Sequence, residues 1–433
     1  MKNIVYASFV VIALLLSGCK KDDTDNHEKA PDIKWEKTYG GSDVDALYAM
    51  KHTADNGYIL YGQTLSNDGD VTKNFAVNDI WLVKIDAQGQ IEWQNTYGGS
   101  QPDMPLDSAS DLVVSNDGGY LITGYTGSDD GNFNSGCSII DGYLMKIDHS
   151  GNIQWVYKAC GNSDDYIMAV TEQNDGSVYV VGNTASTSGD VSIQSGNLTN
   201  FIMKFSSTGA MQWIKYFGGS GNDMFRSIKT LSDGNLIITG ASTSPNIPGN
   251  SNDGSNNIYL AKLSSANGSV IWQKCIDYGD GMIAKEDKDG NIVILANNST
   301  ASDNHGATDL YVVKTDSNGN ILDKKSFGGG SNDFAHDLFI TDNNDYLISG
   351  EVRSNDQDVS GNNGQVDMWL VKLDNDLKMK WQKCLGSPDL DAGYSVSVNN
   401  AGNIAIAGYV GGDGGNVSSY HGGMLDYWIC VLK

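Results

Sequence analysis

The sequence has little positive charge and few long apolar runs. Lys and Arg number 28 against 53 Asp and Glu, which gives a formal net charge of −25. A polyanion needs compensating basic side chains, so this balance argues against nucleic acid or an anionic lipid surface as a partner. Beyond the first twenty residues no apolar run approaches the length of a membrane-spanning helix, and we expect the mature chain not to cross a bilayer.

Common catalytic motifs are also missing. There is no Gly-x-Ser-x-Gly elbow, no His-Glu-x-x-His helix, no Cys-x-x-Cys pair and no phosphate-cradling Gly loop. The six His show no metal-ligand spacing, and His336, on a predicted inner strand, is expected to be a structural residue with satisfied hydrogen bonds. A glycoside hydrolase or lyase could draw its acids from separate repeats, so the linear sequence leaves that class open.

The first residues indicate an export signal. A short basic start precedes an apolar run, Ile4 to Leu16, that is too short for a permanent span. It ends in Leu16-Ser17-Gly18-Cys19, which resembles a bacterial lipobox, whose Cys is acylated and becomes the new N-terminus. Several acyl chains, at about 0.8 kcal/mol per buried CH₂, would anchor the protein firmly. The alternative is an ordinary signal peptide with a chance Cys.

The segment after Cys19 is short and charged. Lys20-Lys21-Asp22-Asp23 resembles the surface-export signal of Bacteroidota lipoproteins, which implies the outer face of the outer membrane. The following residues to Asp32 show no periodicity and are expected to form a flexible, solvent-exposed tether. We therefore divide the chain into a signal peptide (1–18), a lipidated flexible tether (19–32) and a repeat region (33–433).

The repeat region consists of about seven units of about 58 residues, a pattern typical of solenoids and propellers. An Ile-x-Trp, followed by an aromatic residue and Gly-Gly-Ser, marks most units. The Trp column comprises Trp35, Trp93, Trp155, Trp213, Trp272 and Trp381, with Asp323 in place of the missing Trp.

Each unit divides into four predicted strands. Short turns, such as Asn116-Asp117-Gly118-Gly119, join the first strand to the second and the third to the fourth. The first three strands are apolar on nearly every residue, as expected between two neighbouring blades. The fourth alternates between apolar and polar residues, so one of its faces is wet. This pattern predicts a propeller blade with the first strand at the axis and the Trp strand outside, where the Trp side chains pack between blades.

The chain ends predict how the ring closes. The region begins with a lone fourth strand, Ile33 to Tyr39, and ends with a third strand, Tyr427 to Leu432, that no fourth strand follows. We therefore predict an all-β, seven-bladed β-propeller of four-stranded antiparallel blades, in which the N-terminal strand completes the last blade.

The repeat resembles that of secreted and surface propeller proteins of Bacteroidota. The resemblance lies in Asp79-Ile80-Trp81-Leu82-Val83-Lys84-Ile85-Asp86, with Ile91-x-Trp93 and Tyr97-Gly98-Gly99-Ser100 after it, and it covers essentially all of 33–433. It implies the fold but no single activity. The Lys-Ile-Asp-x-x-Gly-x-Ile-x-Trp part is also similar to the tryptophan-docking repeat of PQQ-type quinoproteins. Their adjacent Cys pair is missing here, so this second resemblance implies packing only.

Topology places the second-to-third and fourth-to-first connections, which are the long ones, on one face of the ring, where we expect function to lie. An Asp recurs where the chain enters the inner strand, at Asp45, Asp103, Asp223, Asp333 and Asp391, with Asp165 near the same place. One interpretation is a carboxylate ring that holds a cation, with Ca²⁺ as a possible cofactor. The interpretation we favour is that each Asp fixes its own loop, since a residue present in every blade serves what every blade needs.

A ligand site should instead break the repeat. The clearest breaks are the insertion Pro102 to Ser108, the loop Phe133 to Ile140, the short connection Asp277 to Asp280 and the long final loop Gly411 to Leu425. Candidate ligand residues in these loops are Phe133, Tyr420 and His421.

Besides Cys19 there are five Cys. Reflection of the chain about the turn near Ser150 places Cys137 opposite Cys160, where the two can form a disulfide. Cys275 and Cys384 occupy one repeat position in different blades and are expected to be small buried hydrophobes. We leave the pairing of these two and Cys430 open.

Taken together, these features predict a non-enzymatic surface lipoprotein whose long-loop face binds a glycan or protein partner or serves as a scaffold. A carbohydrate-active enzyme on the same face is the alternative. A glycan array and a hydrolysis screen would separate the two.

Overall fold

The computed structural model describes residues 28–75, 77–106, 111–134, 137, 140–192, 199–248 and 255–433. The predicted signal peptide, the lipidated Cys19 and most of the predicted tether lie outside the described residues. No helix in the described part of the chain is long and apolar enough to span a bilayer.

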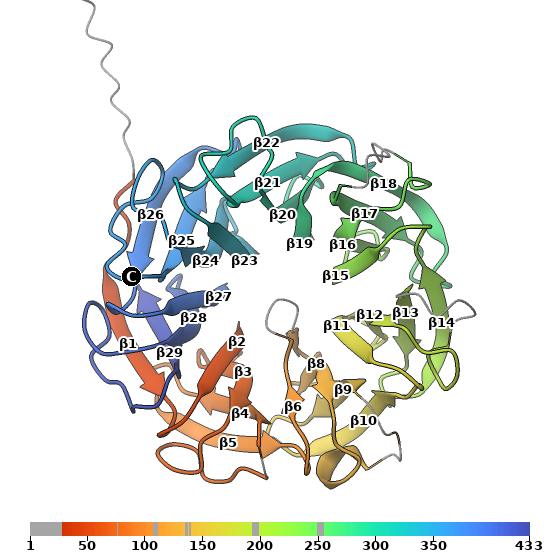
Figure 1. The fold of residues 1–433 in the computed structure, drawn as a ribbon, viewed down its shortest axis with the longest axis horizontal. Coiled ribbons are helices and arrows are strands. Elements are labelled where there is room, and N and C mark those ends of the chain that lie inside the picture. The colour runs from red at the N-terminus through yellow and green to blue at the C-terminus, as the bar shows by residue number, and fades with distance from the viewer. Residues whose placement is uncertain are drawn as a thin grey trace, which may run out of the picture.

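Seven antiparallel sheets stand side by side around a central axis (Figure 1). Blade 1 consists of β2 (Asp45–His52), β3 (Tyr58–Thr64), β4 (Asp79–Ile85) and β5 (Ile91–Tyr97). Blade 2 consists of β6 (Asp103–Met104), β7 (Leu112–Val114), β8 (Tyr120–Thr126), β9 (Asp141–Ile147) and β10 (Ile153–Ala159). Blade 3 consists of β11 (Asp165–Glu172), β12 (Val178–Thr184), β13 (Thr199–Phe205) and β14 (Met211–Phe217). Blade 4 consists of β15 (Asp223–Thr230), β16 (Leu236–Ser242), β17 (Asn257–Leu263) and β18 (Val270–Tyr278). Blade 5 consists of β19 (Asp280–Glu286), β20 (Ile292–Asn298), β21 (Asp309–Thr315) and β22 (Ile321–Phe327). Blade 6 consists of β23 (Asp333–Ile340), β24 (Tyr346–Val352), β25 (Asp367–Leu373) and β26 (Met379–Leu385). Blade 7 is β27 (Asp391–Val398), β28 (Ile404–Val410), β29 (Asp426–Leu432) and β1 (Ile33–Tyr39).

The predicted seven-bladed propeller is confirmed, including its closure. β1 pairs with β29 in register Thr38 with Trp428 and Glu36 with Cys430. The Glu36 carboxylate accepts a hydrogen bond of 2.8 Å from Trp428 Nε1. The two ends of one chain therefore share a sheet, and the ring has no open edge at this blade.

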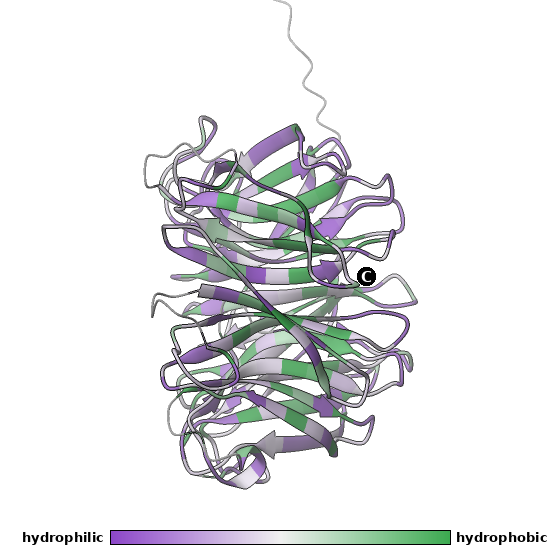
Figure 2. Ribbon diagram, turned by 90° about the vertical axis from the view of Figure 1, so that its right-hand side faces the viewer, coloured by the Kyte–Doolittle hydropathy of each residue, from purple (hydrophilic) through white to green (hydrophobic). Residues whose placement is uncertain are grey.

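Burial falls from the inside of a blade to its rim. All seven residues of β4 are buried, whereas in β5, at the rim, only Tyr97 is buried and Glu92 is exposed. In a view across the ring, the green hydrophobic stretches lie in the strands, and the loops at both faces are mostly purple or white (Figure 2). The core thus lies between neighbouring blades, as in other packed β-sheets.

Six of the seven inner strands carry a β-bulge at the same place. The register of β2 against β3 shifts between Leu47 and Ala49, and the corresponding shift recurs in five other blades. A bulge re-aims the side chain that it leaves unpaired. The skipped residues are Tyr48, Met168, Arg226, Met282, His336 and Tyr394.

Blade 2 departs from the others on its inner side. Its inner strand is split into β6 and β7, and both parts pair with β8. The break falls where the sequence predicted an insertion. Asp111, directly before β7, lines the axis of the ring.

The Trp column packs between blades against the turn glycine of the next one. A Cβ added to Gly209 would lie 2.6 Å from the ring of Trp155, and one added to Gly268 would lie 2.9 Å from Trp213. Gly89, Gly151 and Gly319 meet Trp35, Trp93 and Trp272 in the same way. These glycines also have positive φ, so the turn and the ring contact both require glycine.

Candidate functional site

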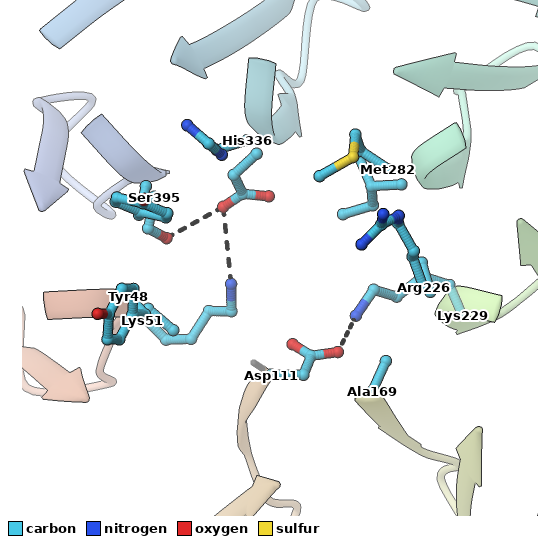
Figure 3. Close-up of a pocket in the computed structure, with 14 residues that line it drawn as sticks. Tyr48, Lys51, Asp111, Ala169, Arg226, Lys229, Met282, His336 and Ser395 are labelled. Carbon is cyan, nitrogen blue, oxygen red and sulfur yellow. Dashed lines mark hydrogen bonds and ion pairs between the residues drawn. The ribbon is translucent and has the colours of Figure 1, made fainter. Parts of the chain in front are cut away.

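The bulged side chains and their neighbours line a narrow channel along the axis of the ring. The channel encloses a volume of about 70 Å³ and is bounded by residues of all seven blades. Figure 3 shows Lys51, Asp111, Lys229 and Ser395 pointing into this space from different inner strands. The sequence analysis missed this layer, although the signal was present as charged residues on otherwise apolar inner strands.

Charges of opposite sign are paired across the channel between different blades. Lys229 Nζ lies 2.5 Å from Asp111 Oδ2, and Asp337 lies 3.5 Å from Lys285 and 3.8 Å from Lys51. Ser395 Oγ donates a hydrogen bond of 3.0 Å to Asp337 (Figure 3). The pairs Lys229–Asp111 and Lys51–Asp337 link blades that do not adjoin in the chain, whereas Lys285–Asp337 links consecutive blades.

The environment fixes the charge states of these groups. Burial alone would raise the pKa of Asp337, but the ammonium groups of Lys285 and Lys51 hold that pKa at about 2. Burial lowers the pKa of Lys285 to about 8, against the attraction of Asp337. Asp337 is thus ionised at neutral pH and is a poor proton donor for general-acid chemistry.

His336 lies beside this network without joining it. Its ring stacks on Tyr394 with centroids 4.3 Å apart, and the Tyr48 ring meets Tyr394 edge-on at 5.2 Å. Burial lowers the pKa of His336 to about 4, so the imidazole is neutral at pH 7. Neither ring nitrogen has a hydrogen-bond partner among the described residues. The expectation of a hydrogen-bonded structural His is therefore wrong, since stacking holds the ring instead.

The five predicted cation ligands do not meet in one ring. Each begins the inner strand of its own blade and accepts hydrogen bonds from its own loops. Asp45 Oδ2, for example, accepts from Gly41 N and from Ser66 Oγ, both at 2.8 Å. The equivalent bonds to Asp103, Asp223, Asp333 and Asp391 come from Gly99, Gly219, Gly329 and Ser387. This arrangement supports the interpretation that each Asp fixes its loop.

Four of these Asp side chains, those of Asp45, Asp103, Asp333 and Asp391, instead face a second buried carboxylate at the junction between blades. A Cβ at Gly386 would lie 2.5 Å from Asp391 Oδ2 and 2.9 Å from Asp367 Oδ1, so the two carboxylates clamp a glycine. Burial, together with the neighbouring acid, raises the pKa of Asp391 to about 6. At two other junctions between blades, burial raises the pKa of Asp165 and of Asp426 to about 7.

The candidate ligand residues differ in exposure. Phe133 is 2% exposed, packs on Tyr143 at 5.1 Å and borders a hollow of about 270 Å³, and its role in ligand binding stays a prediction. Tyr420 is half-buried, and its hydroxyl donates to Gly423 O at 3.0 Å. His421 is partly exposed, and its ring lies 3.3 Å from Asp426 and 3.5 Å from Asp70.

Cys137 and Cys160 form a disulfide, with Cα atoms 5.7 Å apart, at the place where reflection about the turn puts them. Cys275, Cys384 and Cys430 are free and buried. Among the described residues the one cluster with three potential metal ligands is Cys137, Asp141 and Cys160. Its two sulfurs are bonded to each other.

A second hollow opens on the long-loop face between blades 4, 5 and 6. It encloses about 590 Å³ and lies over the short connection at Tyr278, Gly279 and Asp280. The residues around it are Ser255, Asn256, Asn297, Asn298, Ser299, Thr300, Thr308 and Phe334. The sequence had marked this connection as a break in the repeat but gave no sign of a hollow.

No known family model matches the chain, and no curated protein matches it either. Solved structures share the propeller fold at low identity. The WD40 β-propeller domain of Doa1 is 12% identical over 92% of this chain and 97% of that one, with a TM-score of 0.50. A chain of the Mitotic Checkpoint Complex is 10% identical over 98% and 99%, with a TM-score of 0.51. A protein of unknown function from Bacteroides caccae is 14% identical over 72% and 92%, with a TM-score of 0.40. The chain is thus a seven-bladed β-propeller, a fold that by itself assigns no activity.

Proposed function

We propose that the protein is a non-enzymatic binding or scaffold module, lipid-anchored in the outer membrane and exposed at the cell surface. Its partner is a glycan or a protein, and the long-loop face receives that partner. The proposal combines the lipidation signal expected at Cys19 with the properties of the axial channel and of the hollow on the long-loop face.

The observation that carries this proposal is the contrast between the channel and the long-loop face. In the channel the acids Asp111 and Asp337 are paired with lysines, and a space of about 70 Å³ falls below the 300–1,000 Å³ typical of ligand pockets. The long-loop face holds a hollow of about 590 Å³. Space of ligand size therefore lies outside the channel, in this hollow and in one of about 620 Å³ at the short turns around Asp55, Gly118 and Ser150. The hollow on the long-loop face coincides with a break in the repeat.

The same contrast counts against the carbohydrate-active enzyme. A glycoside hydrolase needs one protonated and one ionised carboxyl group flanking the scissile bond. The carboxyl groups with raised pKa, such as Asp165 and Asp391, are buried and bonded to their own loops. None of them can reach a polysaccharide in this conformation.

The test is a glycan array combined with a hydrolysis screen and protein capture, all run on residues 28–433. Binding without product release supports the proposal. Release of reducing ends would overturn the non-enzymatic role. If neither a glycan nor a surface protein is retained, the binding role fails.

The location has its own test. In cells fed labelled palmitate, the intact chain should carry the label and Cys19→Ser should not. Protease added to intact cells should digest the intact protein. A labelled Cys19→Ser chain, or full protection from protease, would contradict the proposed anchor or its orientation.

A further inference from the structure

The hollow between blades 4, 5 and 6 exists because one connecting loop is shorter than its counterparts. Asp280 follows Trp272 by eight positions, whereas Asp45 follows Trp35 by ten. Asp280 pairs with Asn297 of β20, just as Ala46 pairs with Gln63 of β3. Asp280 is therefore the counterpart of Ala46, one place after the position that Asp45 occupies in blade 1. Gly279 therefore occupies the position of the buried Asp of the other blades.

At other junctions between blades, the longer connecting loop fills the space that is open here. At the junction of blades 7 and 1, Ser42 N donates to Asp68 Oδ1 at 2.7 Å and Asp43 N donates to Ser66 Oγ at 3.0 Å. No such loop covers the corresponding residues of blade 5, and Ser299 and Thr300 are exposed. The side chain of Asn298 closes the floor instead, since its Nδ2 donates to Tyr278 O at 2.6 Å.

The lining combines aromatic carbon with neutral polar groups. Tyr278 is 37% exposed and Phe334 is half-buried. Asn256, Ser299 and Thr308 supply amide and hydroxyl groups that both donate and accept hydrogen bonds.

The charge of the lining is balanced. Its one acid, Asp280, receives two hydrogen bonds from the Arg226 guanidinium, at 2.8 and 2.7 Å. This pairing leaves no net charge at the floor. No Lys or His is among the described residues that line the hollow.

This lining selects a class of ligand. An anion would meet no unpaired cation, a metal ion would meet no group of free carboxylates, and an extended apolar ligand would meet mostly polar walls. A sugar ring has an apolar C–H face for an aromatic side chain and a rim of hydroxyls for amides. The volume of about 590 Å³ is typical of small-ligand pockets. We propose that this hollow is a subsite for a neutral saccharide, which rests on the proposed binding function and names its ligand class.

The test uses the full chain in detergent micelles. Neutral gluco-, xylo-, manno- and galacto-oligosaccharides of two to four sugars are titrated calorimetrically, with oligogalacturonate as the anionic comparison. The variants are Tyr278→Ala, which removes the exposed ring, and Ser299→Trp, which fills the hollow from its rim. The matched control is Tyr216→Ala, since Tyr216 is 39% exposed on the outer strand β14, away from the hollow. Thermal unfolding verifies that every variant is folded.

We expect at least one neutral oligosaccharide to bind, with a Kd raised tenfold or more by Tyr278→Ala and Ser299→Trp and changed less than twofold by Tyr216→Ala. Equal binding by all variants would overturn the subsite and leave the binding function standing. Binding of oligogalacturonate alone, or silence across the neutral panel, would overturn the subsite. Hydrolysis of a bound sugar would overturn the non-enzymatic role and leave the subsite standing.

Discussion

At the scale of single residues, the channel shows how a repeat protein holds charge in its centre. The position of Asp111 and Asp337 is filled by Ala49, Ala169, Ser227, Ile283 and Ser395 in the other blades. The pairs of Asp111 with Lys229 and of Asp337 with Lys51 therefore connect blades that are not neighbours in the ring. A buried pair of this kind costs desolvation, but loss of one partner leaves a lone charge.

Asp337→Asn should therefore destabilise the ring strongly. The change leaves Lys285 and Lys51 without their shared anion, and we expect the free energy of unfolding to fall by about 3–5 kcal/mol. Urea unfolding measures this loss. Lys288→Gln is the control, because the Lys288–Asp342 pair is exposed and is worth about 0–1 kcal/mol. Equal losses in the two variants would contradict the assigned role of the channel pair.

The buried carboxylates between blades predict a pH dependence of opposite sign to that of a salt bridge. Burial raises the pKa of Asp165 to about 7, from 3.8. Between these values the folded state holds a proton that the unfolded state releases, so the stability contributed by Asp165 is present below about pH 4 and is lost as pH rises to about 7. Asp165→Asn should make this decline shallower, by up to about 1.4 kcal/mol per pH unit.

Urea unfolding at pH 4.5, 5.5, 6.5 and 7.5 tests this dependence. Asp55→Asn is the control. Burial raises the pKa of Asp55, but the hydrogen bond to Lys84 outweighs this effect and holds the pKa at about 2. Its stabilisation is present above pH 4 and is lost only as pH falls toward 2, so the deficit of that variant should be constant over the range. A parallel pH profile for Asp165→Asn and the intact protein would refute the assignment.

At the scale of elements, the contact between a Trp and the turn glycine of the next blade is a repeated unit of packing. The exception supports this interpretation. Where Asp323 replaces the Trp, the facing turn holds Leu377, at φ 56° and 1% exposed, in place of glycine. Leu377 joins the core cluster between blades 5 and 6. A larger turn residue thus fills the volume that a Trp fills elsewhere.

Exchange of both residues should restore the common pair. Asp323→Trp alone should crowd Leu377, and Leu377→Gly alone should leave a cavity that costs about 2–5 kcal/mol. The double variant should be more stable than the sum of the single changes, by about 1–3 kcal/mol. Lys324→Trp combined with Leu377→Gly is the control and should show additive effects, because Lys324 follows Asp323 by one position and points to the other face of β22, where its ammonium lies 2.6 Å from Asp277. Additivity in both pairs would contradict the proposed packing unit.

The strands were predictable from the sequence because alternation, Asp-Gly turns and a repeated Trp each occur several times. Repetition averages out local ambiguity. The bulges were not predictable, since Tyr48, Arg226 and His336 share no residue type. The hollow depends on how far a loop reaches in space, and a count of three missing positions does not reveal that. Asp391 and Asp367 likewise lie far enough apart in sequence that only the register of the strands brings them together.

At the scale of the whole molecule, closure of the ring is the condition for every site described above. The channel needs inner strands from all seven blades, and the hollow needs three neighbouring blades held side by side. Closure depends on the pairing of β1 with β29, which joins residues almost four hundred positions apart. Contacts of such long range form slowly but remove the free edge that would otherwise pair with another chain.

A disulfide between the two ends tests this closure most directly. The native free Cys430 lies opposite Glu36 in the pairing of β29 with β1. Glu36→Cys should therefore form an intramolecular disulfide under mild oxidation, whereas Lys37→Cys, on the other face of β1, should not. Peptide mapping by mass spectrometry under non-reducing conditions is the measurement. The account predicts a linked peptide pair containing positions 36 and 430 in the first variant alone; a free thiol at position 36 of that variant, or links only between separate molecules, would contradict it.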